Sequence, residues 1–558
     1  MKRTWIRNGT IVDGMGKPSF LGDVLIAGDR IADIVPISAS SGGGPSFRGG
    51  STSSSSPDAS GSRLSGAADP QADETIDATG CLVTPGFIDA HTHSDAYLVL
   101  EPDAPSKISQ GITTEINGQC GGSIAPRYGE ARLSSDWAAL LGERLTWRSL
   151  AEYRAVLAAA RPAVNTVQFI GHNTLRSSVV GYAGRAATPD ELKAMSRLLA
   201  SSLEEGGWGL TTGLIYQPGK YATPEEVLAL AGVAATRGGL YATHMRSEGN
   251  ELLEAIDDVI ALAEKTGIRA EISHLKTSGR RNWHKIDAAL EKIERGMARG
   301  LLLGSDRYPY CASGTDLDIV LPDWAQEGAA PAEMARLQDP SLRSRIVAEI
   351  DAAARDWSTV MIGGTWHPDN KRFSGKTVSE ILRQFGNPSA PTPSPGELVC
   401  EILEKDGCKT GVFFFVMCEE NLSKIYARPW IVPGSDASLR APWGPLSADH
   451  PHPRAYATMP EFYRRVRALG VSREETVARM TGVVAARFGI RNRGIIAKGA
   501  FADLVVWKEN EFRATSTYDK PHQFADGVRL VMVNGSVPYV GGTFTGNRAG
   551  RFLTREDR

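Results

Sequence analysis

A pattern of alternating strand and helix signals, repeated along most of the chain, limits the possible folds more than any other feature. Short apolar, β-branched runs are followed by polar loops and then by amphipathic helical stretches. Strands that alternate with helices pair in parallel, and eight such units indicate an α/β fold of the (β/α)8 TIM-type barrel class. The eight predicted strands lie within residues 87–93, 112–118, 166–173, 208–216, 240–245, 269–276, 301–310 and 430–436.

Helix-start signals stand between these strands. Thr188 is followed by Pro189 and, three residues after the cap, by Glu191, which is the pattern of a capping box with proline at the first helical position. Thr223 precedes a second such helix, for which Gly238 is the predicted stop. The helices of the repeat therefore have defined beginnings and ends.

Both ends of the chain have a different pattern, made of short strands and tight turns. One example is Asn534-Gly535, which favours a type I′ hairpin turn. A β segment before the barrel and another after it predict one small β-sandwich-like domain built from both chain ends. We expect this domain to take residues 1–84 and 490–558, with the barrel at 85–489.

Two segments do not fit either pattern. Residues 38–73 are rich in Ser, Gly and Pro, a composition that buries too little apolar surface to offset the entropy of ordering, so we expect a flexible surface insert. Residues from about 313 to 371 follow the seventh strand and are too many for a simple loop. We expect an inserted subdomain or lid there.

Composition excludes several classes of function. With a formal net charge of -2 and no long Lys/Arg run, the chain of 558 residues has no patch suited to nucleic acid. No apolar run approaches the ~20 residues that span a bilayer, and no apolar segment follows the basic N-terminal residues, so we expect no membrane partner and a cytoplasmic location. The six cysteines are too few and too irregular for a disulfide framework.

The first barrel strand ends in His91-Thr92-His93, and alternate residues of a strand share a face. Two neighbouring imidazoles form half of a site for a zinc-like ion, although a bare His-x-His is also compatible with polar histidines on a turn. Further polar residues stand at predicted strand ends, namely His244, His274 and Asp436. Barrel enzymes build their sites at this face, which favours a metal site.

The motifs TPGFIDAHTHSD, NGQCGGSIAP, GHNTLR, WGLTTGLIYQPG, YATHMRSEG, ISHLK, GSD, HPRAYAT, FADLVV and VNG occur in this order. The chain thereby resembles the D-aminoacylases, or N-acyl-D-amino-acid deacylases, of the amidohydrolase superfamily. The resemblance implies a metal-dependent barrel with a small β-domain. It also implies hydrolysis of the amide of a small-molecule N-acylated D-amino acid to a carboxylate and a free D-amino acid.

The resemblance further implies the metal ligands, which are His91, His93, Cys120, His244, His274 and Asp436. Nitrogen, sulfur and oxygen donors together suit zinc. We expect one tightly bound zinc ion and leave a second, weaker ion open. Cys120 lies between glycines that allow the backbone to approach an ion, whereas an isolated buried cysteine is more often simple packing.

Asp436 is the predicted catalytic residue. As general base it would take a proton from metal-activated water, and as general acid it would pass that proton to the leaving amine. Without the histidines, a Ser-Asp pair at a strand end would be read as a helix cap.

The predicted anchor for the substrate α-carboxylate is Lys276, on the same strand face as His274. The family pattern adds Tyr216 and either Tyr308 or Tyr310, whose hydroxyls could donate to the carboxylate or to a developing oxyanion. The alternatives are a solvated lysine and core tyrosines.

Two other functions compete with deacylation. A cyclic-amide hydrolase of the hydantoinase or dihydroorotase kind shares the barrel and histidines, but such enzymes typically need a bridging lysine on the fourth strand, and WGLTTGLIY has none. An inactive scaffold with this fold would be expected to have lost ligands, and all six are present. The preferred D-amino-acid side chain, neutral or acidic, and the oligomeric state stay open.

Overall fold

The structure is a computed structural model that describes residues 1–37, 72–133, 135–384 and 392–557. The Ser/Gly-rich insert expected at 38–73 lies outside the described residues except for Ala72 and Asp73. Among the described residues, no helix is both long enough and apolar enough to cross a membrane.

All eight predicted barrel strands are present. They are β6 (Phe87–Asp89), β7 (Ile112–Asn117), β8 (Asn165–Gln168) with β9 (Ile170–Gly171), β10 (Gly209–Gly213), β11 (Leu240–His244), β12 (Ala270–Ile272), β13 (Leu303–Arg307) and β17 (Ile431–Pro433). The third predicted strand is divided into β8 and β9 at Phe169.

These strands pair in parallel and in chain order, β6-β7-β8 and β9-β10-β11-β12-β13-β17. The last strand returns to the first through a parallel bridge between Thr92 and Ala437 and through the backbone N–H of Asp436, which donates to His91 O at 2.8 Å. The ring is thereby closed, as expected for a barrel, and the carboxyl ends of all its strands face one mouth.

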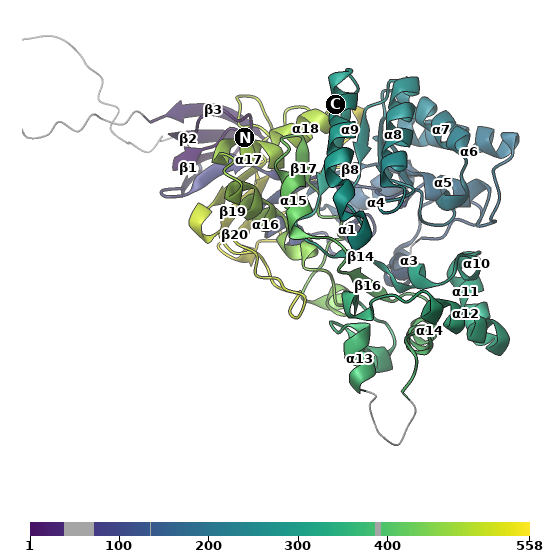
Figure 1. Ribbon diagram of the computed structural model, residues 1–558. Coiled ribbons are helices and arrows are strands. Elements are labelled where there is room, and N and C mark those ends of the chain that lie inside the picture. Colours follow the sequence, from purple (N-terminus) through teal and green to yellow (C-terminus); the bar gives the residue numbers. More distant parts are fainter. Residues whose placement is uncertain (38–71, 134, 385–391, 558) are drawn as a thin grey trace, which may run out of the picture.

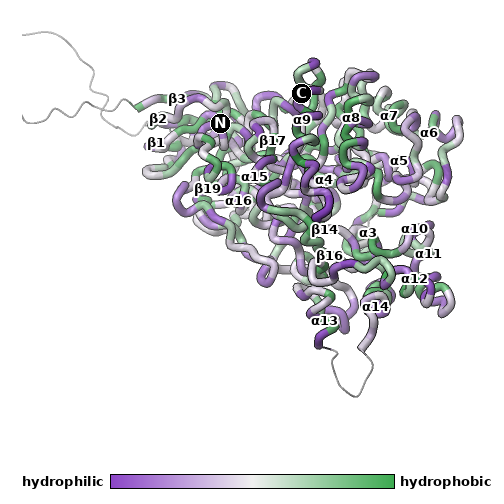
Figure 2. Tube along the Cα trace, viewed as in Figure 1, coloured by the Kyte–Doolittle hydropathy of each residue, from purple (hydrophilic) through white to green (hydrophobic). Residues whose placement is uncertain are grey.

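Helices cover the outside of the ring (Figure 1). Thr188 caps α6 with the full capping box to Glu191, and Thr223 caps α7, as predicted. The outer helices α8 and α9 carry both apolar and polar stretches (Figure 2), and their buried residues form one continuous core with those of the strands. The helices associated with the barrel are α1 (Tyr97–Leu100), α2 (Pro105–Ile108), α3 (Ser135–Leu141), α4 (Leu150–Ala160), α5 (His172–Val179), α6 (Pro189–Glu204), α7 (Pro224–Thr236), α8 (Leu252–Thr266), α9 (Ile286–Ala298), α15 (Glu419–Tyr426), α16 (Arg454–Ala468), α17 (Arg473–Met480) and α18 (Gly482–Phe488).

The two ends of the chain share one nine-stranded sheet. It is joined in its middle by β5 and β18, which pair antiparallel. Asn534 and Gly535 both have positive φ, +48° and +76°, which is the backbone of the predicted type I′ turn. The sheet contains β1 (Arg3–Ile11), β2 (Phe20–Ala27), β3 (Arg30–Pro36), β4 (Glu74–Asp77), β5 (Leu82–Pro85), β18 (Leu504–Trp507), β19 (Val528–Val533), β20 (Ser536–Val540) and β21 (Thr543–Phe544). The division of the chain at residues 84 and 490 stays a prediction.

The excursion after β13 is longer than expected. Its own sheet has β16 (Gly411–Phe414) in the centre, paired with β14 (Ser313–Asp316) and β15 (Val360–Ile362). The central strand follows two further helices, so this sheet continues past residue 371, and the bounds of the insert stay a prediction. A separate apolar cluster packs this sheet against its helices, which project to one side in Figure 1. These are α10 (Asp323–Gln326), α11 (Ala329–Gln338), α12 (Pro340–Ala352), α13 (Val378–Gln384) and α14 (Pro395–Asp406).

Candidate metal centre

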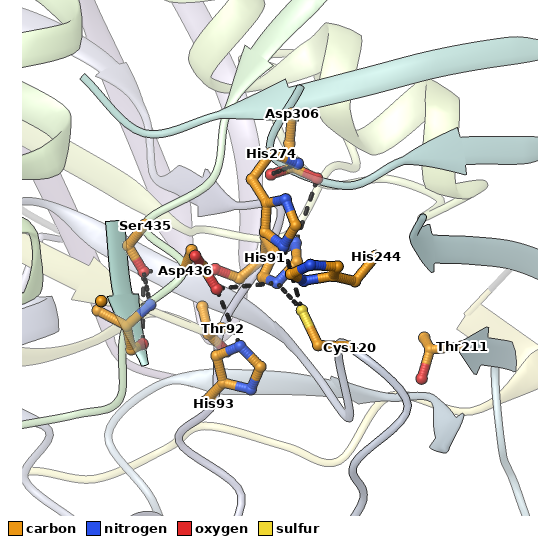
Figure 3. A network of polar contacts seen from close by, with 12 residues as sticks. His91, Thr92, His93, Cys120, Thr211, His244, His274, Asp306, Ser435 and Asp436 are labelled. Atoms are coloured by element: carbon orange, nitrogen blue, oxygen red, sulfur yellow. Dashed lines mark hydrogen bonds and ion pairs between the residues drawn. The ribbon is translucent and has the colours of Figure 1, made fainter. Parts of the chain in front are cut away.

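The six predicted ligands come from five different strand ends and meet at the barrel mouth (Figure 3). His91 and His93 follow β6 and Cys120 follows β7. His244 ends β11, His274 follows β12, and Asp436 follows β17. Since the carboxyl ends of parallel barrel strands converge, residues far apart in the chain face a common point.

Cys120 and Asp436 hold the centre of this group. Cys120 Sγ lies 3.3 Å from His91 Nε2 and 3.3 Å from His274 Nε2. Asp436 Oδ1 lies 3.3 Å from His91 Nε2 and 3.0 Å from His93 Nε2. One sulfur, one carboxylate oxygen and three imidazole nitrogens therefore face each other at short range.

His244 stands beside this group and defines a second one. Its ring centroid is 4.5 Å from that of His274; both ring nitrogens are buried without a hydrogen bond, and Nε2 lies 3.6 Å from Glu248 Oε2. His244, Glu248 and His274 form a second set of donor atoms within 4.8 Å of one another, which shares His274 with the first. A buried imidazole whose nitrogens make no hydrogen bond is costly unless a further partner, such as a metal ion, completes it.

The backbone is strained at three of the candidate ligands. Cys120, His274 and Asp436 have φ of +52°, +37° and +49°, a region that costs non-glycine residues about 1–3 kcal/mol each and is concentrated at functional sites. The Cys120 loop also approaches β10 very closely, since a Cβ on Gly213 would lie 2.0 Å from Cys120 O. The fold thus stores strain to place these side chains.

Asp306 is a functional candidate that the sequence reasoning missed. It is 1% exposed; Oδ2 lies 3.3 Å from His91 Nδ1, and Oδ1 accepts from the backbone N–H of His274 at 3.1 Å. An acceptor on Nδ1 leaves Nε2 of His91 free to bind a metal. The signal was present, because Gly304-Ser305-Asp306 repeats the Gly-Ser-Asp of residues 434–436 at another strand end.

Glu248 also contacts His274, but in a different setting. Its Oε1 lies 3.0 Å from His274 Nδ1, and the Lys276 ammonium, which can only donate, lies 2.7 Å from the same nitrogen, while Nε2 faces Cys120. A carboxylate alone therefore sets the tautomer of His91, whereas Nδ1 of His274 has both a donor and an acceptor in reach.

The charges in the centre stabilise one another. Burial raises the pKa of the Cys120 thiol, but the charges of His91 and His274 outweigh it and hold this pKa well below its usual value. Burial also raises the pKa of Asp436, and Arg454 and His274 more than reverse the effect. For His93 burial lowers the pKa, but the hydrogen bond to Asp436 and the contacts with Cys120 raise it to about 9. Two anions, Cys120 and Asp436, thus face histidine nitrogens that carry protons when no cation is bound.

The donor set fits zinc. Imidazole nitrogen, thiolate sulfur and carboxylate oxygen are its usual protein ligands. A cation would complete the His244 nitrogens, which make no hydrogen bond, and would compensate the charges of Cys120 and Asp436. The two donor groups share His274.

The predicted substrate residues surround this group unequally. Lys276 is 3% exposed; its ammonium forms an ion pair with Glu248 and lies 2.7 Å from His274 Nδ1, so it is not a solvated lysine. The Tyr216 ring lies 5.0 Å from that of His244. Burial, with the nearby Cys120 charge, raises the pKa of Tyr216 well above its usual value, which keeps the phenol protonated.

Tyr308 and Tyr310 differ in position. The Tyr308 ring lies 6.5 Å from His274, with the Lys276 ammonium 5.8 Å and the Arg454 guanidinium 4.6 Å from its centroid. Tyr310 instead packs against His452, at 5.2 Å. Both hydroxyls are buried without a hydrogen bond. The geometry favours Tyr308 as the tyrosine nearer to the metal ligands.

Arg454 fixes the second oxygen of Asp436, because its Nη1 donates to Oδ2 at 2.8 Å. It stands at the start of α16 and is 6% exposed. Asp436 therefore presents Oδ1 to the histidines and Oδ2 to a fixed cation.

Comparison with known proteins finds a matching family and similar proteins. Residues 74–539 match the model of an amidohydrolase family. N-acyl-D-glutamate deacylase of Alcaligenes xylosoxydans xylosoxydans is 32% identical over 99% of this chain and 96% of its own length.

Two solved structures share this level of similarity. D-aminoacylase, studied for its binuclear metal centre, superimposes with a TM-score of 0.77 at 32% identity and 99% coverage of both chains. N-acyl-D-glutamate deacylase of Bordetella bronchiseptica, in complex with zinc and a phosphonate inhibitor, gives 0.78 at 30% identity, covering 99% of this chain and 100% of that one.

The alternative family is more distant. A dihydropyrimidinase from Brevibacillus agri has a TM-score of 0.56 at 16% identity, which shows a shared fold alone. The fourth barrel strand, β10, also contains no lysine. With a family model that matches most of the chain and a relative similar along nearly its whole length, the protein belongs to the amidohydrolase family.

Proposed function

We propose that this protein is a zinc-dependent N-acyl-D-amino-acid deacylase, which hydrolyses a linear amide to a carboxylate and a free D-amino acid. The observation that carries the proposal is the meeting of all six candidate ligands at one mouth of the ring. The full-length similarity to deacylases of N-acyl-D-amino acids supports the same substrate class. An inactive scaffold would have no need of the three strained backbone positions.

Zinc would be held by His91, His93, Cys120, His244, His274 and Asp436, with one ion bound tightly and the group around His244 and Glu248 available to a second, weaker one. When bound, zinc supplies Lewis-acid chemistry, which polarises an amide carbonyl and makes water a stronger acid near neutral pH.

Asp436 is the proposed general base and acid. Its pKa lies well below the usual value, because the charges of Arg454 and His274 outweigh burial, so it is ionised and able to accept a proton from the attacking water. Arg454 holds Oδ2, so the proposed proton acceptor is Oδ1, the oxygen that faces His91 and His93. The proton that Asp436 accepts is the proton that the leaving nitrogen needs.

The substrate α-carboxylate is proposed to bind Lys276, with Tyr216 and Tyr308 as hydroxyl donors. The Lys276 ammonium is paired with Glu248 and has three protons, so it can donate to Glu248 and to a substrate carboxylate at the same time. The hydroxyl of Tyr308 is buried without a hydrogen bond, and the Lys276 and Arg454 cations lie near its ring, so a carboxylate oxygen that binds here would complete the hydroxyl. Tyr310 is the weaker candidate because it packs against His452.

The test is a hydrolysis panel of N-acetyl derivatives of D- and L-amino acids, with neutral and acidic side chains, together with hydantoin and dihydropyrimidine rings. We expect release of D-amino acids only, loss of activity after removal of metal with a chelator, and recovery with zinc. Asp436→Asn should lower kcat by about 100-fold or more, the usual contribution of a general base.

Asp406→Asn serves as the matched control, since Asp406 is a buried, hydrogen-bonded carboxylate in the insert. It should leave kcat unchanged. Release of L-amino acids only, ring opening without deacylation, or full activity after chelation would each contradict the proposal.

A further inference from the structure

Lys107 is a fully buried lysine for which the proposed reaction gives no role. It belongs to α2, in the connection between the first two barrel strands, and its side chain is 0% exposed. A buried ammonium is retained only where it is paired and hydrogen-bonded. Its partners therefore indicate what it is for.

Two of the partners are carboxylates on neighbouring strands. Lys107 Nζ lies 2.9 Å from Asp89 Oδ2 at the end of β6 and 3.1 Å from Glu115 Oε1 in β7. Both carboxylates are fully buried. This ion cluster joins the first strand, which carries His91 two residues after Asp89, to the second.

The other two partners flank the proposed catalytic carboxylate. Lys107 Nζ donates to Ser435 Oγ at 3.0 Å and to Ala437 O at 3.0 Å, the residues before and after Asp436. Asp89 makes a third hydrogen bond to this segment, because its Oδ1 accepts from the backbone N–H of Ser435 at 2.7 Å. Asp436 itself has a φ of +49°, so the surroundings must impose its conformation.

These contacts lie where the barrel closes. Within the described part of the chain, the first and last strands meet through the single bridge between Thr92 and Ala437 and a few backbone hydrogen bonds near it, instead of a long ladder. The position of Asp436 relative to His91 and His93 therefore depends on side chains that cross this seam, and Lys107 contacts both sides of it.

We propose that Lys107 is a positioning residue for Asp436: its ammonium fixes the 435–437 backbone against the first strand and thereby aims the carboxylate at the metal ligands. The inference rests on the proposed function only in that Asp436 serves as base. The ammonium has three protons and four acceptors in reach. An uncharged side chain of similar volume, or the planar fork of arginine, does not reproduce this arrangement.

The experiment compares Lys107→Met and Ser435→Ala with Arg493→Met. Arg493 is buried and forms an ion pair with Asp503 away from the metal ligands, so its loss reports the effect of breaking a buried ion pair as such. For each variant we would measure kcat and KM with the N-acetyl-D-amino acid found by the panel, the visible spectrum of the cobalt-substituted protein, and Tm.

We expect Lys107→Met to lower kcat by about 100-fold, as a misplaced catalytic group does, with KM changed by less than about 3-fold. Ser435→Ala keeps both ion pairs and removes the contacts of the hydroxyl with Lys107, with His91 O and with the backbone of Ala437, so its kcat should fall by about 5-fold. Both should alter the cobalt spectrum, which reports the ligand geometry including Asp436. Arg493→Met should lower Tm without changing kcat or the spectrum.

A lower Tm with wild-type kcat and spectrum in both Lys107→Met and Ser435→Ala would overturn the inference. If Lys107→Met does not yield folded protein, Ser435→Ala decides alone, because it leaves the buried charges balanced. If the wild-type protein binds cobalt but hydrolyses nothing in the panel, the proposed function fails, while the spectra of the variants still test the positioning of Asp436.

Discussion

Asp306 gives the sharpest test of how the metal centre is assembled, because it is predicted to control zinc affinity without touching the ion. Its two oxygens serve two different donors, Nδ1 of His91 and the backbone N–H of His274. The perturbation is Asp306→Asn, which preserves shape but provides one acceptor and one donor in place of two acceptors.

Either orientation of the new amide loses one of these bonds. If its oxygen faces the His274 N–H, its NH₂ group faces His91 Nδ1 and forces the histidine proton onto Nε2, the nitrogen that a metal needs. If its oxygen faces His91, two N–H groups oppose each other at His274. Loss of one charged hydrogen bond costs about 1.5–3 kcal/mol. This matches the roughly 10–100-fold loss of metal affinity usual for such partners.

The assay is competition for zinc against a chromophoric chelator at fixed pH. Asp406→Asn is the control, since Asp406 is also buried and accepts from the backbone N–H of His367 at 2.7 Å and from Thr410 Oγ1 at 2.7 Å. It should destabilise the insert and leave zinc affinity unchanged. A zinc Kd for Asp306→Asn within about 3-fold of wild type would refute the reasoning, because the tautomer argument requires at least the lower limit of about 10-fold.

Three further outcomes are expected. Cys120→Ser removes a proposed direct ligand, so zinc affinity should fall by more than the roughly 100-fold limit for indirect partners, and the cobalt-substituted protein should lose its thiolate absorption; unchanged absorption would place Cys120 outside the centre. Asp318 and Glu333 each have a pKa of about 7, because burial raises it, and for Asp318 the charge of Glu333 raises it further. From about pH 4 upward the unfolded chain releases these protons, whereas the folded chain keeps them, so Tm should fall as pH rises toward 7. Glu333→Gln should reduce the slope of Tm against pH, and a slope equal to that of the wild type would contradict this prediction. Thr188→Ala removes the α6 cap and should cost about 1 kcal/mol in urea unfolding with unchanged kcat; loss of activity would show that α6 is coupled to the site.

Much of the fold was predictable because local patterns determine it. The strand and helix periods alternate along the chain, and caps such as Thr188 satisfy local backbone groups, so both can be recognised without knowing tertiary contacts. The end of the insert was not predictable in this way. Its central strand, β16, is short and pairs with β14, about a hundred residues earlier, which no local pattern records.

In the candidate site, too, local patterns predict some features and not others. Motifs identify His91, Cys120 and Asp436 as chemistry-bearing residues, but not the geometry that they share. Asp306 and Lys107 act through contacts across 215 and 330 residues of chain. The repeated Gly-Ser-Asp marks Asp306 only once it is compared with residues 434–436, and Lys107 has no local signal that separates it from an ordinary polar residue. Lys276 is predicted from the sequence as the anchor for the α-carboxylate, and its pairing with Glu248 appears only once β12 and the loop after β11 are placed together.

The joint between β5 and β18 has a consequence for biosynthesis. Trp507 donates to Thr84 Oγ1 across 423 residues, so β5 leaves the ribosome long before its partner exists. Until then one edge of β5 is an unpaired hydrogen-bonding template, open to self-association. We expect newly made chains to depend on chaperones during that interval, and chains that stop before β18 to aggregate even when every metal ligand has been synthesised.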